Sequence, residues 1–538
     1  MKVKGEECLN TSHVLKGAFL LSVAALVTKL LSAVYRIPFQ NLAGDLGFYV
    51  YQQVYPFFGM MTILALYGFP VVLSRQIAEK KAQGKDEEVN ELLSYTFLGL
   101  SILSIMICVL FLVFAPQLAF FIGDESLTSV IQLVGFGFLF LPILSVFRGA
   151  GQGINQMTPT ALSQVSEQFV RVVAILVLTY VLASQGYDAY VIGEGAIYAS
   201  LLGSAVGCVF LLMLANKKEM RFYTHFSFKK FYRHQAVFLK QSLFICLNSL
   251  ILLLFQVVDV LTVVRSLQAT PMSDVAIYTA KGVYDRGQPL IQLGTILITA
   301  IALAVVPLLS NALASKRYKD ARRYRDVMMR LTILLGGGAT IGLFLLMDSI
   351  NAMLFTNQAG TDVLRVFVLS IFPCSIYLAG AAIIQGYGRI HIPVYAIIAG
   401  IGTKIVGNVL FITFIKSTMG AALSNVLAFS VMMGIVLYSV KKIDQRLFVQ
   451  KQSYVMLLVV LFSMGVLVFG IQVGMNQLLS LPNQRSVHAI QAFTLAGIGA
   501  GYVGVAVLFT HIFTLREWAS APKLGALRKQ VIQKFINK

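Results

Sequence analysis

Long apolar runs recur along the whole chain and are separated by short polar stretches. Each run holds about 20 mostly apolar residues, the length that an α-helix needs to cross the hydrocarbon core of a bilayer. The pattern predicts about fourteen membrane-spanning helices, at 17–39, 48–73, 91–114, 128–148, 159–183, 190–215, 237–265, 283–310, 327–349, 362–385, 393–415, 418–440, 454–476 and 487–513. A composition of 57% hydrophobic and 12% charged residues agrees. We therefore expect an all-α polytopic membrane protein.

The loops between the runs differ in charge. Basic loops follow the second, sixth, eighth and twelfth runs, at 75–85, 216–234, 315–325 and 441–451. Alternate loops contain neither Lys nor Arg, at 41–47, 115–126 and 184–190. By the positive-inside rule the basic loops are cytoplasmic, and both termini are then inside the cell. The net charge of +20 therefore indicates topology and contact with anionic membrane lipids rather than nucleic-acid binding.

Processing signals and metal-binding motifs are not expected. The first run is too long for a signal peptide, contains Lys29 and is not followed by a small-residue cleavage motif, so we expect it to remain in the protein. The five cysteines and six histidines show neither paired nor ligand-like spacing. We therefore predict no disulfide framework, no metal and no cofactor.

Several motifs recur at an offset of 233 to 236 residues. Tyr51 and Tyr284 are each followed five residues later by Pro, in "YQQVYP" and "YDRGQP". Arg171 and Lys404, two cations inside apolar runs, each lie 19 residues beyond a Gln-Gly turn. The order of the matches is the same in both halves, which indicates an internal duplication.

The offset amounts to six spans, an even number, so both halves have the same orientation in the membrane. We expect two parallel-repeat six-helix bundles around a central cavity, an N-terminal one over 1–222 and a C-terminal one over 223–440. Two extra transmembrane helices and an amphipathic cytoplasmic tail would follow in 441–538. Paired bundles that hold a substrate between them are a transporter architecture.

Cations within or at the ends of the apolar runs are the strongest functional signal. A cation at the centre of a bilayer costs about 2.5 to 3.5 kcal/mol on insertion scales, so intramembrane cations mark substrate or ion sites. Lys29 and Arg36, seven residues apart, are predicted to form a stripe on one face of the first span. We expect an anionic substrate to be bound by Lys29, Arg36, Arg75, Arg171, Arg265, Arg286 and Lys404.

Structural alternatives for these cations stay open. Arg36 lies near the outer end of its span, so its side chain could extend to the membrane interface. Arg75 closes the second span on the cytoplasmic side and could be a topological anchor. Lys29 is the hardest to explain in this way, because it is predicted to lie near the middle of the bilayer.

Two acidic residues, Glu167 and Asp259, are the candidates for ion coupling. Each also has a basic neighbour that could neutralise it. Glu167 precedes Arg171 by four residues, the favourable order for a helical ion pair. Asp259 could pair with Arg36 or Arg265 on another helix. Coupling to sodium, protons or the membrane potential stays open.

Two stretches of the N-terminal region resemble a known family: "GAFLLSVAALVTKLLSAVYRIPFQNLAGDLGFYVYQQVYP" and "LYGFPVVLSRQIAE". They are similar to the stage V sporulation protein B and polysaccharide-transporter branch of the multidrug/oligosaccharidyl-lipid/polysaccharide exporter superfamily, which includes lipid II flippases. The resemblance recurs at "GVYDRGQPL" and "VVPLLSNALA". In length, span count and duplication it covers the whole chain.

The resemblance implies a bacterial cell-membrane flippase that works by alternating access. Its cargo would be an undecaprenyl-pyrophosphate-linked saccharide, such as lipid II, and its cavity cations would lie on the first, second and eighth spans. These positions correspond to Lys29, Arg36, Arg75 and Arg286. Arginine offers forked donors that match phosphate oxygens.

Two other classes of protein are alternatives to a flippase. A cation-coupled multidrug exporter of the same superfamily would need unpaired carboxylates, whereas this chain has mainly intramembrane cations. A membrane enzyme would need clustered acidic residues or histidines with metal-ligand spacing, and the sequence has none. We therefore expect a monomeric transporter rather than an enzyme.

Overall fold

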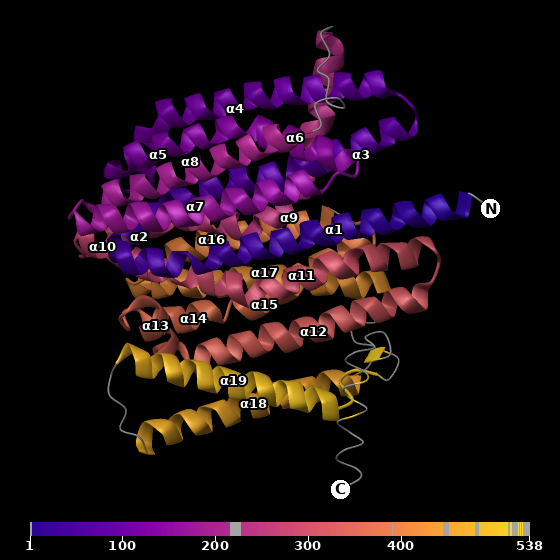
Figure 1. Cartoon of the computed structure of the whole chain (residues 1–538). Coiled ribbons are helices and arrows are strands. Elements are labelled where there is room, and N and C mark those ends of the chain that lie inside the picture. Colours follow the sequence, from indigo (N-terminus) through magenta and orange to yellow (C-terminus); the bar gives the residue numbers. More distant parts are fainter. Residues whose placement is uncertain are drawn as a thin grey trace. The chain divides into compact units, whose positions relative to one another are not determined.

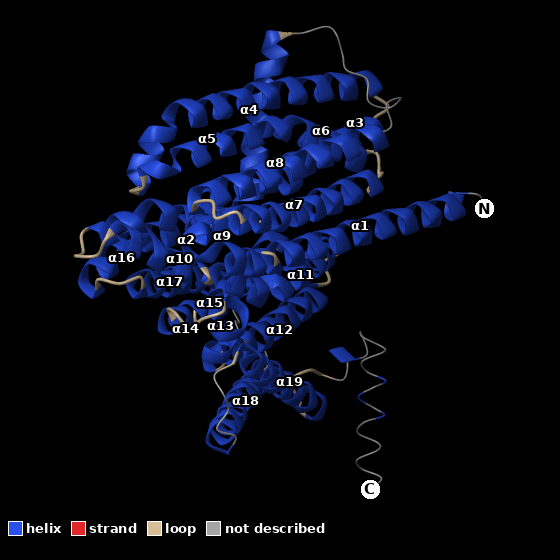
Figure 2. Cartoon of the chain, turned by 60° about the vertical axis from the view of Figure 1, so that its left-hand side comes forward, coloured by secondary structure: helices blue, strands red, loops and turns tan. Residues whose placement is uncertain are grey.

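The computed structural model describes residues 3–215, 227–389, 391–444, 451–478 and 484–514, together with 517, 518, 526, 528 and 530. Within these ranges the regular structure consists of helices (Figure 2). The all-α fold class is therefore confirmed. The predicted amphipathic tail, 524–538, lies almost wholly outside the described residues, as does 216–226 of the central basic loop.

The chain divides into two compact units (Figure 1). Unit 1 comprises Met1–Asp285 and Asn408–Thr418, and unit 2 comprises Arg286–Gly407 and Met419–Lys538. The domain boundaries expected from the sequence, after 222 and 440, stay a prediction.

The helices of unit 1 begin with a long α1 and end with the short α10. They are α1 (Val3–Val34), α2 (Arg36–Ile63), the π-helical η1 (Leu64–Gly68), α3 (Phe69–Ala82), α4 (Asp86–Ile122), η2 (Glu125–Leu127), α5 (Thr128–Gly137), η3 (Phe138–Phe140), α6 (Leu141–Gly153), α7 (Thr158–Ser184), α8 (Ala189–Leu214), α9 (Phe228–Gln268) and α10 (Asp274–Asp285).

Unit 2 contains the remaining helices, except that the last part of α16 belongs to unit 1. They are α11 (Gly287–Ala314), α12 (Tyr318–Leu345), α13 (Met347–Phe355), α14 (Thr361–Val368), α15 (Ile371–Gly386), α16 (His391–Ile415), α17 (Met419–Asp444), α18 (Lys451–Leu478) and α19 (Arg485–Phe509).

Thirteen stretches of the described chain are long and apolar enough to span a membrane. The first, Phe19–Ala82, is 64 residues long, far more than the roughly 20 residues of one crossing. Within it α1 runs in one direction and α2 to α3 in the other (Figure 1). This stretch therefore accounts for two of the predicted spans, and each of the others matches one.

A close helix pair, α7 and α8, forms much of unit 1. Two glycines on α8 allow this approach. A Cβ at Gly203 would lie 2.8 Å from the Glu167 carbonyl oxygen, and one at Gly207 would lie 3.1 Å from the Glu167 carboxylate. Because neither glycine has a side chain, the two backbones come close enough for charged groups on α7 to be enclosed.

The most buried span of unit 2 is Thr361–Gly386, which contains α14 and α15. Helix α15 packs against α11, α12 and α17, while α18 and α19 pair with each other and pack on α12 and α13. Apolar residues cover α15 on all sides, as expected of a helix that is surrounded by others.

The motifs of the predicted duplication occupy matching elements. The first Gln-Gly motif ends α6, in a turn where Asn155 has a φ of 61°, and the second ends α15, in a turn where Gly388 has a φ of 78°. The helix after each turn, α7 or α16, carries the cation of the motif, Arg171 or Lys404.

Candidate functional site

Arg36, the first residue of α2, is fully buried in unit 1. None of its three guanidinium nitrogens makes a hydrogen bond of good geometry with any described residue. A buried donor without a partner costs about 1 to 3 kcal/mol, and more when it is charged. The side chain is enclosed by unit 1 and does not extend to the surface, as it would if it reached the membrane interface. The arrangement leaves several donors available to an anionic group.

Tyrosines surround this guanidinium. Its Cζ lies 4.1 Å from the centroid of the Tyr55 ring, and Tyr51 packs on Tyr55 with ring centroids 5.6 Å apart. The hydroxyls of Tyr35 and Tyr51 are hydrogen-bonded at 2.7 Å. A cation–π contact contributes about 0.5 to 2 kcal/mol, so it compensates only part of the cost of burying the charge.

Lys29 lies in a different environment from Arg36. Its side chain, on α1, is exposed on unit 1, whereas Arg36 is enclosed. The two predicted members of one cationic stripe therefore do not share surroundings.

A second buried charge cluster joins Glu167 to two arginines. Arg171 donates to one carboxylate oxygen at 2.5 Å, and Arg148 of α6 donates to the other at 2.7 Å. Arg171 also donates to Gln168 at 3.0 Å, and Arg148 donates to the Ala65 carbonyl of the π-helical turn at 3.4 Å. The predicted pairing of Glu167 with Arg171 is formed, but it is one half of a triad.

Arg148 was not predicted as a site residue. It closes the fourth predicted span, where an arginine is ordinarily a boundary residue. The structure instead continues this helix to Gly153 and buries Arg148 completely. Arg148 and Glu167 are 19 residues apart in the sequence, and this spacing does not by itself indicate a contact.

Two predicted cations have structural partners on the surface of unit 1. Arg75 pairs with Glu79 at 2.9 Å, and both side chains are largely exposed. Arg265 donates to the carbonyls of Phe120 and Phe121 at the end of α4. Their described contacts are an exposed ion pair and a helix cap.

In unit 2, Arg286 and Lys404 are both fully buried. Arg286 donates to the side-chain oxygens of Asn351 and Asn357, at 3.1 and 2.8 Å. Lys404 donates to the Asn425 side-chain oxygen at 2.7 Å. Both cations therefore have side-chain amide oxygens among their hydrogen-bond partners.

The acidic candidate Asp259 accepts hydrogen bonds from the Tyr284 hydroxyl and from the Asn408 amide, both at 3.0 Å. Neither Arg36 nor Arg265 forms an ion pair with it, so the proposed pairings are not formed. Tyr284 therefore has a polar role in addition to packing.

Sequence reasoning also missed a second acid–base pair on α10. Lys281 and Asp285 are buried and 2.6 Å apart. The predicted span began at 283, which placed Lys281 in a loop. The structure begins α10 at Asp274, so the pair lies one turn apart inside the helix.

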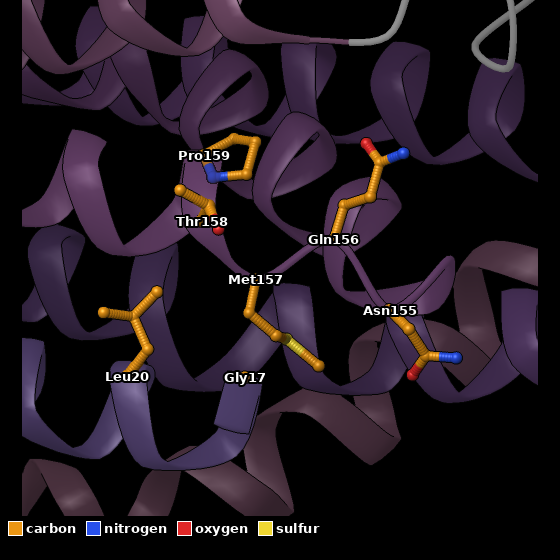
Figure 3. A pocket seen from close by; sticks show the side chains of 7 residues that line it. All are labelled: Gly17, Leu20, Asn155, Gln156, Met157, Thr158 and Pro159. Atoms are coloured by element: carbon orange, nitrogen blue, oxygen red, sulfur yellow. The ribbon is translucent and has the colours of Figure 1, made fainter. Parts of the chain in front are cut away.

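A separate cavity of about 450 Å³ lies in unit 1, between the middle of α1 and the turn from α6 to α7 (Figure 3). Its lining residues are Gly17, Leu20, Asn155, Gln156, Met157, Thr158 and Pro159. It contains none of the predicted site cations.

The fold and the site define the class of this protein. It is a multi-pass α-helical membrane protein with charged groups buried inside its helical units. Comparison identifies the family. The chain belongs to the polysaccharide biosynthesis protein family, whose model matches residues 14–313. The MatE model matches residues 245–410. The superfamily expected from the sequence, one of membrane flippases and transporters, is confirmed.

Three relatives from Bacillus subtilis (strain 168) agree with this assignment. The chain is 34% identical over 520 residues to the uncharacterized membrane protein YabM, with 96% of each chain covered. It is 25% identical over 529 residues to the lipid II flippase MurJ, covering 91% of this chain and 94% of that one. Stage V sporulation protein B is 26% identical over 364 residues, or 65% and 68% of the two chains.

Among solved structures, the lipid II flippase MurJ in an inward closed conformation matches with a TM-score of 0.67. The match covers 90% of this chain and 98% of that one at 14% identity. The two proteins therefore have the same fold.

Proposed function

We propose that this protein moves an undecaprenyl-pyrophosphate-linked saccharide from the inner to the outer leaflet of a bacterial cell membrane by alternating access. The observation that carries the proposal is Arg36. Its guanidinium is fully buried beside tyrosine side chains, and none of its nitrogens makes a hydrogen bond of good geometry with a described residue. A lipid pyrophosphate offers the oxygens that such a group requires.

The charges of the other candidates support an anionic cargo. The triad of Arg148, Glu167 and Arg171 has one more positive than negative group. In a low-dielectric interior these charges attract an anion strongly. The name of one relative, a lipid II flippase, points to the same kind of cargo.

The second candidate is a cation-coupled multidrug exporter, which the MatE match over residues 245–410 favours. Such a pump would need a carboxylate open to a cationic drug. Glu167 is held between two arginines, and Asp259 accepts from a tyrosine and an asparagine. These contacts support the anionic cargo. Glu167 and Asp259 remain the positions at which to look for ion coupling.

A transport assay in proteoliposomes distinguishes the two functions. One preparation is loaded with a fluorescent undecaprenyl-pyrophosphate saccharide and another with a cationic dye. We expect protein-dependent movement of the lipid-linked sugar and none of the dye. Dye transport without movement of the sugar would favour the exporter and would contradict the proposal.

A further inference from the structure

Helix α9 is longer than a membrane crossing requires. It runs over Phe228–Gln268, 41 residues, about twice the roughly 20 residues of one crossing. At 1.5 Å per residue, the helix is about 60 Å long. Its first turns project beyond α4 (Figure 1, Figure 2). We call 228–243 the N-terminal segment of α9. It packs on the first turns of α4, where Glu91, Tyr95 and Thr96 lie.

One face of the segment is fixed on α4. His234 and Thr96 are hydrogen-bonded at 3.0 Å, and Gln235 donates to the Tyr95 carbonyl at 2.6 Å. Lys230 pairs with Glu91 at 3.0 Å. These contacts hold the segment in one rotational position, so its opposite faces are defined.

The outward faces combine cations with large apolar side chains. Three exposed cations lie on this side of the helix: Lys229, Arg233 and Lys240. They are spaced by four and seven residues, so they form one row along the helix. A neighbouring row contains Phe228 and Tyr232, whose exposed fractions are 73% and 69%. Water would disfavour this apolar row, but a membrane interface accommodates both rows.

We propose that this face of α9 binds the headgroups of anionic phospholipids, with Lys229, Arg233 and Lys240 contacting phosphate and Phe228 and Tyr232 inserted among the acyl chains. The basic row and the apolar row are both complementary to one surface, the interface of an anionic membrane. Each basic side chain near an anionic leaflet contributes about 1 kcal/mol, and exposed aromatic rings favour the level of the headgroups. A nucleic acid would match the basic row and leave the apolar row in water. The site is separate from the proposed transport path, so it stands or falls independently of the cargo.

The test uses the full-length protein in nanodiscs of phosphatidylcholine that contain a small fraction of photoactivatable phosphatidylglycerol or photoactivatable phosphatidylcholine. Crosslinked peptides are quantified by mass spectrometry. We expect labelling of 228–243 by the anionic probe to exceed labelling by the zwitterionic probe several-fold. The variant K229Q/R233Q/K240Q should bring labelling by the two probes to about the same level, because each basic side chain is worth roughly fivefold in binding.

Two further variants make the result specific. K316Q/R317Q/K319Q removes three exposed cations from the turn before α12 and should leave labelling of α9 unchanged. K229R/K240R keeps the charge and should keep the excess of labelling by the anionic probe. This variant still tests the role of charge if the glutamine variant fails to fold. Equal labelling of 228–243 by both probes, or an undiminished excess in a folded glutamine variant, would overturn the proposal.

Discussion

At the residue scale, Glu167 is the group whose loss should cost most stability. Its carboxylate accepts from Arg148 and Arg171, and all three side chains are buried. E167Q leaves two guanidinium groups facing each other without a counter-charge. Removing one member of a buried ion pair typically costs about 3 to 5 kcal/mol. We expect a clearly lower thermal unfolding midpoint in detergent and reduced expression.

The double variant R148Q/E167Q is the matched comparison. It removes one cation together with the acid and leaves Arg171 beside two amides, so it should be more stable than E167Q alone. A midpoint for E167Q equal to that of the unmodified protein would show that the triad contributes nothing to folding.

His234 gives a pH-dependent prediction. Burial against Tyr95 and Phe238 lowers the pKa of His234 to about 4, although the nearby Glu91 opposes this shift. The unfolded chain, with a pKa near 6.5, therefore binds more protons between pH 6.5 and 4. The contribution of this residue to folding is complete above pH 6.5 and falls with acidification, by about 2 kcal/mol at pH 5.

Amide exchange along α9 measures this effect. Peptides covering 228–240 should exchange faster at pH 5 than at pH 7.5 once the intrinsic rates are corrected, and H234Q should abolish the difference. A difference that persists in H234Q would assign the effect to another group, with Glu91 the first to examine.

Sequence reasoning identified Arg36 because a cation inside an apolar run is costly wherever it occurs. It missed Arg148 and Lys281 for the opposite reason. Both lie at predicted span ends, where cations are expected, and the helices continue past them. Span boundaries are soft, because an apolar run sets the minimum length of a helix and polar turns can extend it.

At the scale of elements, the segment after α19 is held on α12 by one buried arginine. Arg330 donates to Glu517 and to the Ile512 carbonyl, and its Cζ lies 5.3 Å from the Phe513 ring. The single tryptophan of the chain, Trp518, packs edge-on against that ring with centroids 6.2 Å apart. Detachment of this segment would therefore change the surroundings of Trp518.

We expect R330Q to release this segment, because Glu517 loses its buried counter-charge and returns to water. The emission of Trp518 should shift to longer wavelength, and trypsin should cleave beyond 510 more rapidly. R317Q, which removes an exposed pair with Asp320 at 3.8 Å, should leave both readouts unchanged. An unshifted emission in R330Q would mean that apolar packing alone holds the segment.

The predicted spans all coincide with helices, because an apolar run of about 20 residues determines a membrane helix almost by itself. The helix of Arg36 is broken at Gly44, with a φ of 70°, inside the predicted loop 41–47. The π-helical turn over Leu64–Gly68 was not predictable in this way, because an apolar pattern does not distinguish one kind of helical turn from another.

At the scale of the whole molecule, the charge asymmetry of the loops predicts the orientation. In a variant whose native cysteines are replaced, a membrane-impermeant maleimide should label Y187C in intact cells. It should label K319C only after the membrane is permeabilised. Both positions are exposed. The reverse pattern would invert the topology and place the basic loops outside.

The contacts of the candidate site could not be predicted from the internal duplication. Arg171 and Lys404 occupy matching positions on α7 and α16, yet one binds a carboxylate and the other an amide. Duplicated sequences preserve the backbone more faithfully than the partners of each side chain. Whether a buried cation is neutralised therefore has to be read from the structure.

Our central proposal is that the Arg36 guanidinium, buried and without a hydrogen bond of good geometry to a described residue, binds an anionic lipid headgroup. It is tested most directly by movement of a fluorescent undecaprenyl-pyrophosphate saccharide in proteoliposomes containing R36A, R36K or, as a control, K319A. R36A should insert normally, since it removes a charge that is unfavourable inside an apolar run, and it should lose transport. R36K should retain part of it if charge suffices and lose it if the fork is required, while K319A should transport normally. Full transport by R36A would contradict the claim, because the guanidinium would then have only a structural role beside Tyr55.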